Sequence, residues 1–511
     1  MKNAIRASLA AALLAGAAAH AQTAISVDAE TPIGTIRPEI YGQFVEHLGT
    51  QIYGDGIWVG EDSDIPNTGG IRDDVFAALE ALDIPVMRWP GGCFADLYHW
   101  RDGIGPRDER VGRVNMVWGN TPESNQFGTH EFFDLAERLG AKTYLNINLG
   151  SGTVREAMEW LEYISFDGES ALAQERRDNG REAPWRVDYI TVGNETWGCG
   201  GRMLAPTYAD HYTRWMTFLR TGGEQPVRIL SGSHDGNLDY SAQLLEHPQI
   251  QEVAEGVSLH YYTLPTGDWS AKGAAIGFPE AEWATTMQRA LAIDTVIEEQ
   301  LALLEAAGAG PDFDLYVDEW GMWVDGEEGA PALYQQSSIR DAVVAGLSLN
   351  VFHTHADRVA MTNIAQMVNV LQAMILTDGP DMLLTPTYHV YRMYRPFQGA
   401  EALPVTLDGP DYMQGEVTVP ALSVSAARTE DGTLVLSLVN LDPSQSHEVS
   451  LSWPGISAVE GEVLTGDAMD AHNTFDAPDR VRPHPADVSV EGDAVSASLP
   501  PHSVSVWRIR S

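Results

Sequence analysis

The sequence predicts a (β/α)8 barrel followed by an all-β sandwich. Between residues 38 and 398, eight apolar strand-like runs alternate with amphipathic helical stretches, which is the element count of such a barrel. After Pro396 the helical periodicity disappears, and short runs of alternating polar and apolar residues take its place. A length of 511 residues also exceeds one typical core, which favours a large domain with a smaller one. A doubly wound open sheet is the alternative, but no Gly-x-Gly-x-x-Gly motif follows the first strand.

The barrel prediction rests on apolar runs of strand length separated by helical faces. Apolar residues recur every three or four positions over residues 71–82, and Val154, Met158, Leu161 and Ile164 repeat the pattern. The candidate strands are residues 40–45, 85–89, 143–148, 187–192, 227–230, 257–262, 315–318 and 358–362.

The C-terminal part has the strand pattern of a sandwich. Residues 434–438 and 449–453 alternate between apolar and polar side chains, and Asp431-Gly432 is a hairpin turn signal between two such runs. A short apolar run near the N-terminus could add a strand to the same sheets. The expected division is a signal peptide over 1–21, a strand segment joining the sandwich over 22–37, the barrel over 38–398 and the sandwich over 399–511.

Residues 1–21 have the pattern of a signal peptide. Lys2 and Arg6 precede a run of small residues and leucines over 7–18, and Ala19-His20-Ala21 offers a small-x-small cleavage site. The apolar run is too short to span a bilayer, which argues against a membrane anchor. We therefore expect export to the periplasm or the extracellular space after removal of this segment.

The charge balance is strongly acidic. The formal net charge of −41 becomes −43 once Lys2 and Arg6 are removed. Such a surface repels nucleic acid and anionic lipid, so we expect neither nucleic acid nor a membrane as partner. A neutral polysaccharide fits this charge better than an acidic one. Solubility in a saline or periplasmic medium is the alternative explanation for a charge of this size.

The cysteine and histidine patterns do not predict a metal site. Cys93 and Cys199 lack the spacing of zinc ligands, and no His-Glu-x-x-His motif occurs in the sequence. His353 and His355 stand without acidic or cysteine companions, and we interpret them as structural. We therefore predict neither a metal nor an organic cofactor. The residues alone leave the cysteines open between one disulfide and two buried thiols.

Two glutamates follow two of the predicted strands. Asn194-Glu195 comes after the run at 187–192, and Glu319-Trp320 comes after the run at 315–318. A single glutamate after a strand is more often a cap or a loop charge. Cleavage of a glycosidic bond, however, requires two carboxylic groups, one to protonate the leaving oxygen and one to attack the anomeric carbon. On a barrel, the pair therefore predicts a glycoside hydrolase.

Other polar and aromatic residues at the strand ends predict a sugar-binding rim, because reactive residues of a (β/α)8 barrel lie at the carboxyl ends of its strands. Amides and carboxylates bind hydroxyl groups, and aromatic faces pack on sugar rings. Taken alone, Glu46 also fits a solvated loop charge, and Gln366 a surface helix residue. Arg88 within an apolar strand needs a carboxylate partner, which Glu319 would supply. The candidate binding residues are Glu46, Arg88, Cys93, Asn194, His260, Tyr262, Trp320 and Gln366.

These residues lie in segments that resemble glycoside hydrolase family 51, the α-L-arabinofuranosidases. The resemblance covers nearly the whole chain beyond residue 21, in the family's order. It implies a retaining exo-enzyme on a (β/α)8 barrel with a C-terminal β-sandwich. By motif position, Glu195 would be the acid/base and Glu319 the nucleophile. Glu46, Asn194 and Gln366 would hold the furanose hydroxyls, while Arg88, His260 and Tyr262 would position the nucleophile. The matching segments are residues 41–49, 88–92, 125–132, 193–195, 317–320, 363–366 and 472–475.

The chain departs from many members of this family at Cys93, where they carry Asn. The branch with cysteine at this position often carries Trp-Gly-Cys-Gly-Gly after the acid/base, as residues 197–201 do here. The resemblance therefore implies that Cys93 and Cys199 lie close together, as a candidate disulfide at the rim of the pocket. It also suggests a homo-oligomer.

The activity implied by the resemblance is release of terminal non-reducing α-L-arabinofuranosyl residues. Arabinoxylan, arabinan or their oligosaccharides would be the substrates. A β-xylosidase, an endoglucanase or a galactofuranosidase on the same scaffold are the alternatives within the enzyme class. A non-catalytic carbohydrate-binding protein is the alternative outside it, although both carboxylates are present.

Overall fold

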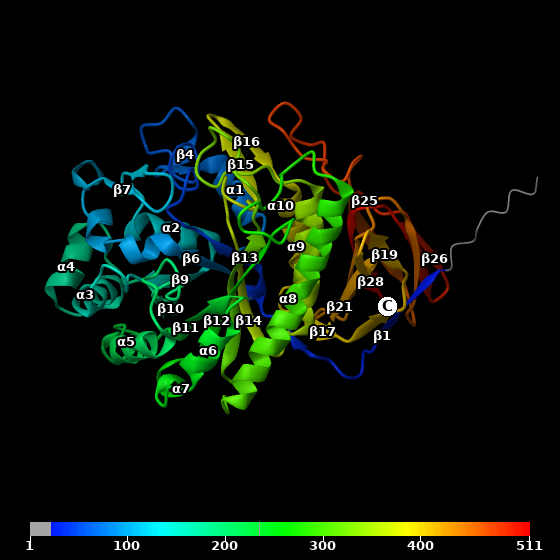
Figure 1. Cartoon of the computed structure of the whole chain (residues 1–511). Coiled ribbons are helices and arrows are strands. Elements are labelled where there is room, and N and C mark those ends of the chain that lie inside the picture. Colours follow the sequence, from blue (N-terminus) through cyan, green and yellow to red (C-terminus); the bar gives the residue numbers. More distant parts are fainter. Residues whose placement is uncertain (1–21, 235) are drawn as a thin grey trace, which may run out of the picture.

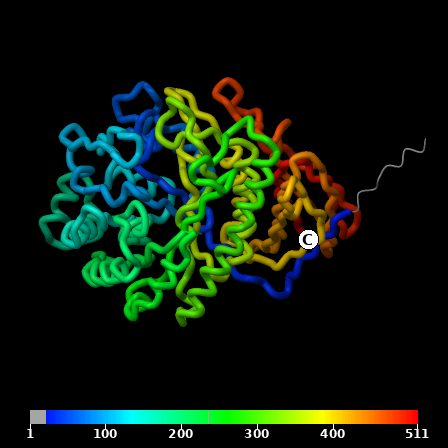
Figure 2. Tube along the Cα trace, viewed as in Figure 1, coloured from blue at the N-terminus to red at the C-terminus, as the bar shows by residue number. Residues whose placement is uncertain are grey.

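The computed structural model describes residues 22–234 and 236–511. The segment 1–21, for which a signal peptide was expected, lies outside these residues. Figure 1 shows two parts side by side, a barrel surrounded by helices and a sandwich of strands that contains the C-terminus. The tube in Figure 2 shows the blue N-terminal segment running from the sandwich into the barrel.

Eight parallel strands close into a barrel, as the sequence predicts. Each of the eight predicted runs overlaps one strand. The first strand is shorter than predicted, because residues Pro38–Tyr41 form a 3₁₀ helix, η1. In chain order the strands are β3 (Gly42–Phe44), β6 (Val86–Trp89), β9 (Lys142–Ile147), β10 (Tyr189–Val192), β11 (Val227–His234), β12 (Gly256–Thr263), β13 (Asp314–Met322) and β14 (Val359–Ile364).

Helices cover the outside of the barrel. Helix α3 begins after Thr153, whose side-chain oxygen accepts the backbone N–H of Glu156. Its buried face differs from the prediction, because Trp160 occupies the inner face and Met158 is exposed. Among the described residues, no helix is both long and apolar enough to cross a membrane. The helices are α1 (Asp73–Glu80), α2 (Thr129–Leu139), α3 (Val154–Ser165), α4 (Ala171–Asp178), α5 (Ala205–Phe218), α6 (Leu238–Leu245), α7 (Ile250–Val253), α8 (Glu280–Ala306), α9 (Ile339–Thr354) and α10 (Pro386–Tyr394).

The sandwich consists of a five-stranded and a seven-stranded sheet. The first has the order β18 (Val405–Leu407), β1 (Thr23–Val27), β23 (His447–Ser452), β27 (Ala494–Leu499) and β26 (Val488–Glu491). The second has the order β2 (Gly34–Thr35), β17 (Glu401–Leu403), β21 (Leu422–Arg428), β22 (Leu434–Asn440), β28 (Ser503–Arg510), β24 (Ala458–Leu464) and β25 (His484–Pro485). Short hairpins complete the fold: β4 (Asn67–Thr68) with β5 (Ile71–Arg72), β7 (Arg113–Asn115) with β8 (Thr121–Glu123), β15 (Ile375–Asp378) with β16 (Asp381–Leu384), and β19 (Asp411–Gln414) with β20 (Val417–Pro420).

The N-terminal strand β1 lies inside the five-stranded sheet, between β18 and β23. The turn at Asp431-Gly432 connects β21 with β22, and Gly432 has a φ of +85°, which favours glycine. We propose residues 38–398 as the barrel unit, with residues 22–37 and 399–511 as the sandwich unit.

Helix α9 joins the two units, because every residue from Ile339 to His353 is buried. A Cβ at Gly346 would lie 3.2 Å from the Tyr394 hydroxyl and 3.2 Å from the Val439 side chain, so glycine allows close approach to β22. Asn350 donates to Ser423 over 3.0 Å and accepts from Tyr394 over 3.1 Å. The helix therefore packs on the seven-stranded sheet through both apolar and polar contacts.

His353 continues this interface. Its Nε2 lies 2.8 Å from the hydroxyl of Tyr41 in the barrel, and its Nδ1 lies 2.8 Å from Ser425 in the sandwich. Burial lowers the pKa of His353 to about 3, so the ring is neutral at neutral pH. His355 contacts Asp294 over 2.7 Å. Both histidines therefore have local hydrogen-bond partners in the fold.

The lowered pKa of His353 predicts a pH dependence of stability. Its contribution is complete above the unfolded pKa of about 6.5 and declines as the pH falls towards 3, because only the unfolded chain takes up the proton. Through this group the wild-type protein should lose about 2 kcal/mol of unfolding free energy between pH 7 and 5. His353→Gln should not show this part of the loss. Thermal unfolding at both pH values measures this, with the exposed His484→Gln as control. Equal losses in the His353→Gln and wild-type proteins would contradict the assignment.

Candidate active site

The carboxyl ends of the barrel strands enclose a cavity of about 290 Å³. Seven of the expected site residues line it: Glu46, Cys93, Glu195, His260, Tyr262, Glu319 and Gln366. Arg88 and Asn194 lie beneath them, each buried and bonded to the other. Strands distant in sequence therefore bring nine of the ten expected residues together, as a parallel barrel does.

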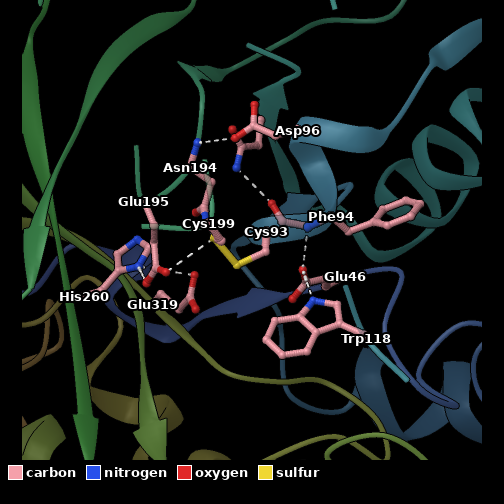
Figure 3. The surroundings of a disulfide bond; sticks show 12 residues. Glu46, Cys93, Phe94, Asp96, Trp118, Asn194, Glu195, Cys199, His260 and Glu319 are labelled. Atoms are coloured by element: carbon pink, nitrogen blue, oxygen red, sulfur yellow. Dashed lines mark hydrogen bonds and ion pairs between the residues drawn. A yellow bond between two sulfur atoms is a disulfide. The ribbon is translucent and has the colours of Figure 1, made fainter. Parts of the chain in front are cut away.

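The loop after β10 carries Glu195 in a left-handed backbone conformation, with a φ of +42°. Two residues earlier, Gly193 has a φ of +78°, a backbone conformation that favours glycine. Cys199 of the same loop is joined to Cys93 by a disulfide, with the Cα atoms 5.6 Å apart. Figure 3 shows this bond beside Glu195, whose Oε2 lies 3.5 Å from the Cys199 sulfur.

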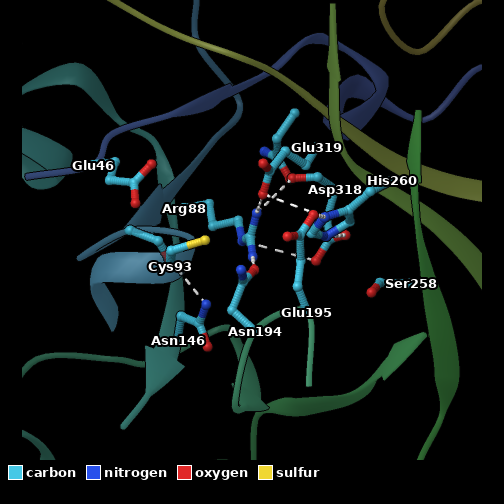
Figure 4. A network of polar contacts seen from close by, with 12 residues as sticks. Glu46, Arg88, Cys93, Asn146, Asn194, Glu195, Ser258, His260, Asp318 and Glu319 are labelled. Atoms are coloured by element: carbon cyan, nitrogen blue, oxygen red, sulfur yellow. Dashed lines mark hydrogen bonds and ion pairs between the residues drawn. The ribbon is translucent and has the colours of Figure 1, made fainter. Parts of the chain in front are cut away.

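Arg88 forms the centre of a buried charge network (Figure 4). Its Nη1 donates to Glu319 Oε2 over 3.0 Å, and its Nη2 donates to the Asn194 side chain over 2.6 Å. Burial would lower the pKa of Arg88, but the negative charges of Asp318 and Glu319 raise it. Burial would raise the pKa of Asp318, but the charge of Arg88 and contacts with His260 and Tyr144 lower it. The network therefore keeps both the guanidinium and the Asp318 carboxylate ionised.

His260 lies between the two candidate catalytic glutamates. Its Nδ1 is 2.8 Å from Glu195 Oε1 and 3.4 Å from Glu319 Oε2, while its Nε2 is 3.2 Å from Asp318. Burial would lower the pKa of His260, but the charge of Glu319 and the bonds with Asp318 and Glu195 raise it to about 10. A carboxylate oxygen of Glu195 and one of Glu319 lie within 4.8 Å of each other.

Both oxygens of Glu319 have a donor. Besides the bond from Arg88 to Oε2, the Tyr262 hydroxyl donates to Oε1 over 2.7 Å. These two donors fix the orientation of the carboxylate group, because each oxygen accepts a directed hydrogen bond. The site thus holds Glu319 between two donors, and Glu195 lines the same cavity in contact with His260.

Glu46 lies at the opposite wall of the cavity. Its carboxylate accepts from the Phe94 backbone over 3.1 Å, from the Trp118 indole over 3.2 Å and from Gln366 over 2.9 Å. Gln51 in turn donates to Gln366 over 2.6 Å, which fixes the orientation of the Gln366 amide. Burial, together with the charge of Glu319, raises the pKa of Glu46 to about 7.

Trp320 is the one expected site residue that lies away from the cavity. It is 1% exposed, donates to Thr362 over 3.0 Å and packs on Phe352. Successive side chains of a strand point to opposite faces, so Glu319 and Trp320 diverge, whereas Trp323 returns to the cavity side. Counting by two from Glu319 would have identified Trp323 from the sequence.

Sequence reasoning also missed the aromatic wall of the cavity. Trp323 lies 4.9 Å from Tyr262, 5.4 Å from Trp269 and 6.3 Å from Trp118, between ring centroids. On another side, Trp197 lies 4.3 Å from His234. Trp118 and Trp269 belong to segments between the barrel strands, whose course no strand pattern predicts.

The fold and the paired carboxylates are those of a glycoside hydrolase with a barrel catalytic unit. One family model, described as an alpha-L-arabinofuranosidase 1 domain, matches residues 78–275. A second, described as an alpha-L-arabinofuranosidase C-terminal domain, matches residues 318–503. A Bacteroides ovatus protein, named an intracellular exo-alpha-L-arabinofuranosidase, is 44% identical over 493 residues that cover 95% of each chain. The chain therefore belongs to glycoside hydrolase family 51, the α-L-arabinofuranosidases.

Solved structures agree with this membership. The GH51 arabinofuranosidase from Xanthomonas axonopodis pv. citri is 44% identical and superposes with a TM-score of 0.93, covering 96% of this chain and 100% of that one. The Thermotoga maritima alpha-L-arabinofuranosidase, solved as an arabinose complex, is 27% identical with a TM-score of 0.81, covering 95% and 99%. The predicted family and fold are confirmed.

The expected export is wrong on the same comparison, because the Bacteroides ovatus relative is named an intracellular enzyme. The expectation rested on Lys2, Arg6 and a run made largely of alanine. Alanine buries little apolar surface, so such a run is a weak hydrophobic signal. The segment itself lies outside the described residues.

The raised pKa of Glu46 predicts that its carboxyl group titrates near neutral pH. Its contribution to stability is complete below the unfolded pKa of about 4.5 and is lost as the pH rises through about 7. Infrared difference spectra between pH 6 and 8 should show loss of a protonated carboxyl band, which Glu46→Gln abolishes. A Glu46 band that titrates near pH 4.5 would mean that the three hydrogen-bond donors outweigh burial.

Proposed function

We propose that the chain is a retaining exo-α-L-arabinofuranosidase that uses Glu319 as nucleophile and Glu195 as acid/base. The separation of the two carboxylates carries the proposal. Their nearest oxygens lie within 4.8 Å, and retaining enzymes hold the two carboxyl groups about 5 to 5.5 Å apart, whereas inverting enzymes leave room for a water molecule. The cavity is also small, about 290 Å³, which suits removal of a terminal residue.

In the first step, Glu319 attacks the anomeric carbon while the bond from that carbon to the glycosidic oxygen breaks. The donors Arg88 and Tyr262 hold Glu319 in the orientation for this attack. Glu195 transfers its proton to the leaving oxygen, so that the aglycone departs as a neutral alcohol. The His260 ring holds Oε1 of Glu195 and faces the nucleophile with the same nitrogen.

In the second step, water attacks the anomeric carbon of the arabinosyl ester on Glu319. Glu195 accepts a proton from this water, and the bond from the carbon to Glu319 breaks. Glu195 is thereby reprotonated and Glu319 is released as a carboxylate. The sugar retains its anomeric configuration because two displacements occur at the same carbon.

The sugar-binding roles follow from the groups that face the cavity. Glu46 and Gln366 form a hydrogen-bonded pair whose remaining lone pairs and donors can bind furanose hydroxyls. Asn194 lies beneath, held by Arg88 through its side-chain oxygen. The Cys93 sulfur supplies an apolar wall at this end of the cavity, where an amide would have offered polar atoms.

Arabinoxylan, arabinan or their oligosaccharides are the proposed substrates. β-Xylosidase, endoglucanase and galactofuranosidase activities remain the alternatives on this scaffold. A non-catalytic carbohydrate-binding role is disfavoured, because such a protein would not need two carboxylates held close together by a buried network. A homo-oligomer remains a prediction.

The two glutamates should respond differently to substitution. Glu195→Ala should cripple substrates with poor leaving groups but spare activated aryl glycosides in the first step, with azide restoring the second step. Glu319→Ala should lose activity on both kinds of substrate. Steady-state kinetics with and without azide measure this. NMR should show the retained anomer as first product, and the inverted anomer would overturn the role assignments.

A substrate panel tests the proposed specificity. Of the nitrophenyl glycosides of α-L-arabinofuranose, β-D-xylopyranose and β-D-galactofuranose, the arabinofuranoside should be cleaved fastest. Arabinoxylan oligosaccharides of known branching should lose single arabinose units. Exhaustive chelation should leave these rates unchanged, since both reacting groups are side chains. Activity confined to the xyloside or to long glucans would contradict the proposal.

A further inference from the structure

The 3₁₀ helix η2 (Cys93–Leu97) contains two residues that contact the loop carrying Glu195. This helix follows β6, and β9 lies between β6 and β10 in the barrel. Cys93, at its first position, forms the disulfide with Cys199. Asp96, one turn later, lies 4% exposed beneath the same loop. Neither Asp96 nor the disulfide bond takes part in the two displacement steps.

The Asp96 carboxylate joins the ends of two neighbouring strands. One oxygen, Oδ1, accepts the backbone N–H groups of Leu149 and Gly150 after β9, both over 2.8 Å. The other, Oδ2, accepts the backbone N–H of Asn194 after β10, over 3.2 Å. Three backbone donors thus converge on one buried carboxylate, and the last of them belongs to the residue before Glu195. Burial raises the pKa of Asp96 to about 6, while the three backbone N–H groups act in the opposite direction and favour the ionised form. No interaction within the described part of the chain gives Asp96 a cationic partner.

The disulfide holds the same loop at a second point, after Glu195. Cys199 follows Glu195 by four residues, and the backbone N–H groups of Gly198 and Gly200 both donate to the carbonyl of Glu195, over 2.6 and 3.1 Å. A Cβ at Gly200 would lie 2.0 Å from the Asn194 carbonyl oxygen and 2.9 Å from Asp96 Oδ2, so the loop lies tightly against Asp96. Figure 3 shows Asp96, the disulfide and Glu195 grouped around this loop.

We propose that Asp96 and the Cys93–Cys199 disulfide act together as a brace that positions the acid/base Glu195 for proton transfer. The brace grips the loop at Asn194 and at Cys199, on both sides of the glutamate. The proposal rests on the proposed role of Glu195. Asp96 and the cysteines are positioning residues, because they act on the proton donor through the backbone.

Such a brace has a specific chemical effect. Glu195 occupies a strained left-handed backbone position, and its protonated carboxyl group is the proton donor to the leaving oxygen. Attack by Glu319 depends on Arg88 and Tyr262, which belong to other strands. Arg88 also donates to Asn194 in the loop over 2.6 Å, but its bond to Glu319 does not pass through the loop. Loosening the loop should therefore weaken protonation of the leaving group more than it weakens the attack by Glu319.

The brace can be released without substitution. A phosphine reductant breaks the S–S bond, supplying two electrons, while two protons from water complete the two thiols and the phosphine takes up the water oxygen. Cys199 is exposed and Cys93 lines the cavity, so the bond is accessible. The contact through Asp96 can be weakened by substitution. In Asp96→Asn the amide has only one acceptor oxygen, whereas the three backbone N–H groups need two.

The test is the dependence of kcat/KM on the leaving group, measured with aryl α-L-arabinofuranosides of phenols of increasing pKa. For Glu195→Ala, kcat/KM should fall by about 10²- to 10⁴-fold on the poorest leaving groups, because general acid catalysis is lost. For Asp96→Asn, for Cys93→Ala/Cys199→Ala and for the phosphine-reduced wild-type protein, the fall on the same substrates should be about 10- to 100-fold, as expected for a misplaced catalytic group. All four should lose far less on dinitrophenyl arabinofuranoside.

Matched controls separate positioning from general destabilisation. Asp442 is likewise a buried aspartate that accepts two backbone N–H groups, from Ser444 and Gln445, but it lies in the sandwich. In Asp442→Asn, kcat/KM should depend on the pKa of the leaving phenol as it does in the wild-type protein. The reductant should not change the slope of Cys93→Ala/Cys199→Ala. If Asp96→Asn does not fold, the double cysteine variant and the reduced wild-type protein carry the test.

The outcomes separate the two proposals. The brace alone would be overturned if kcat/KM depended steeply on leaving-group pKa in Glu195→Ala, but as in the wild-type protein in Asp96→Asn, in Cys93→Ala/Cys199→Ala and in the reduced protein. A uniform loss across all leaving groups in those variants would also overturn it, because a merely structural role predicts that result. An unchanged slope for Glu195→Ala would overturn the acid/base assignment, and the brace with it.

Discussion

The guanidinium of Arg88 lies inside the barrel between Asp318 and Glu319, and the other groups of the site are arranged around this buried ion pair. Removing charges from water is costly, and breaking such a pair by loss of one partner costs about 3–5 kcal/mol. His260 adds a second cation against the same two carboxylates. The barrel interior therefore supplies positive charge at fixed positions beside Asp318 and Glu319.

This constraint explains how much of the site the sequence could predict. A charged residue inside an apolar strand, such as Arg88, needs a partner, and a parallel barrel brings strand ends to one mouth. Those two rules predict that Glu46, Glu195, Glu319 and Gln366 lie together at the mouth of the barrel, where they line the cavity. The fold followed in the same way, because eight apolar runs with helical faces between them leave few architectures.

The parts that sequence reasoning missed depend on side-chain direction and loop course. Trp320 directly follows Glu319, which predicts a site residue. Strand alternation instead points Trp320 into the core and brings Trp323 to the cavity. Trp118 reaches Glu46 from a segment whose path no periodicity predicts. Asp96 could have been suspected only from its spacing to Cys93, because its partners are backbone groups that carry no sequence signal.

Glu319 lies on β13, and the next helix along the chain, α9, connects the barrel to the sandwich. After β13 the chain passes into α9, which is buried between the barrel and the seven-stranded sheet. Gly346 and Asn350 on α9 contact β22 of that sheet or its neighbours, so the helix cannot shift without disturbing both units. Apolar residues of β13 and of α9 belong to one continuous core. The packing of α9 on the sandwich therefore also supports the strand that carries Glu319.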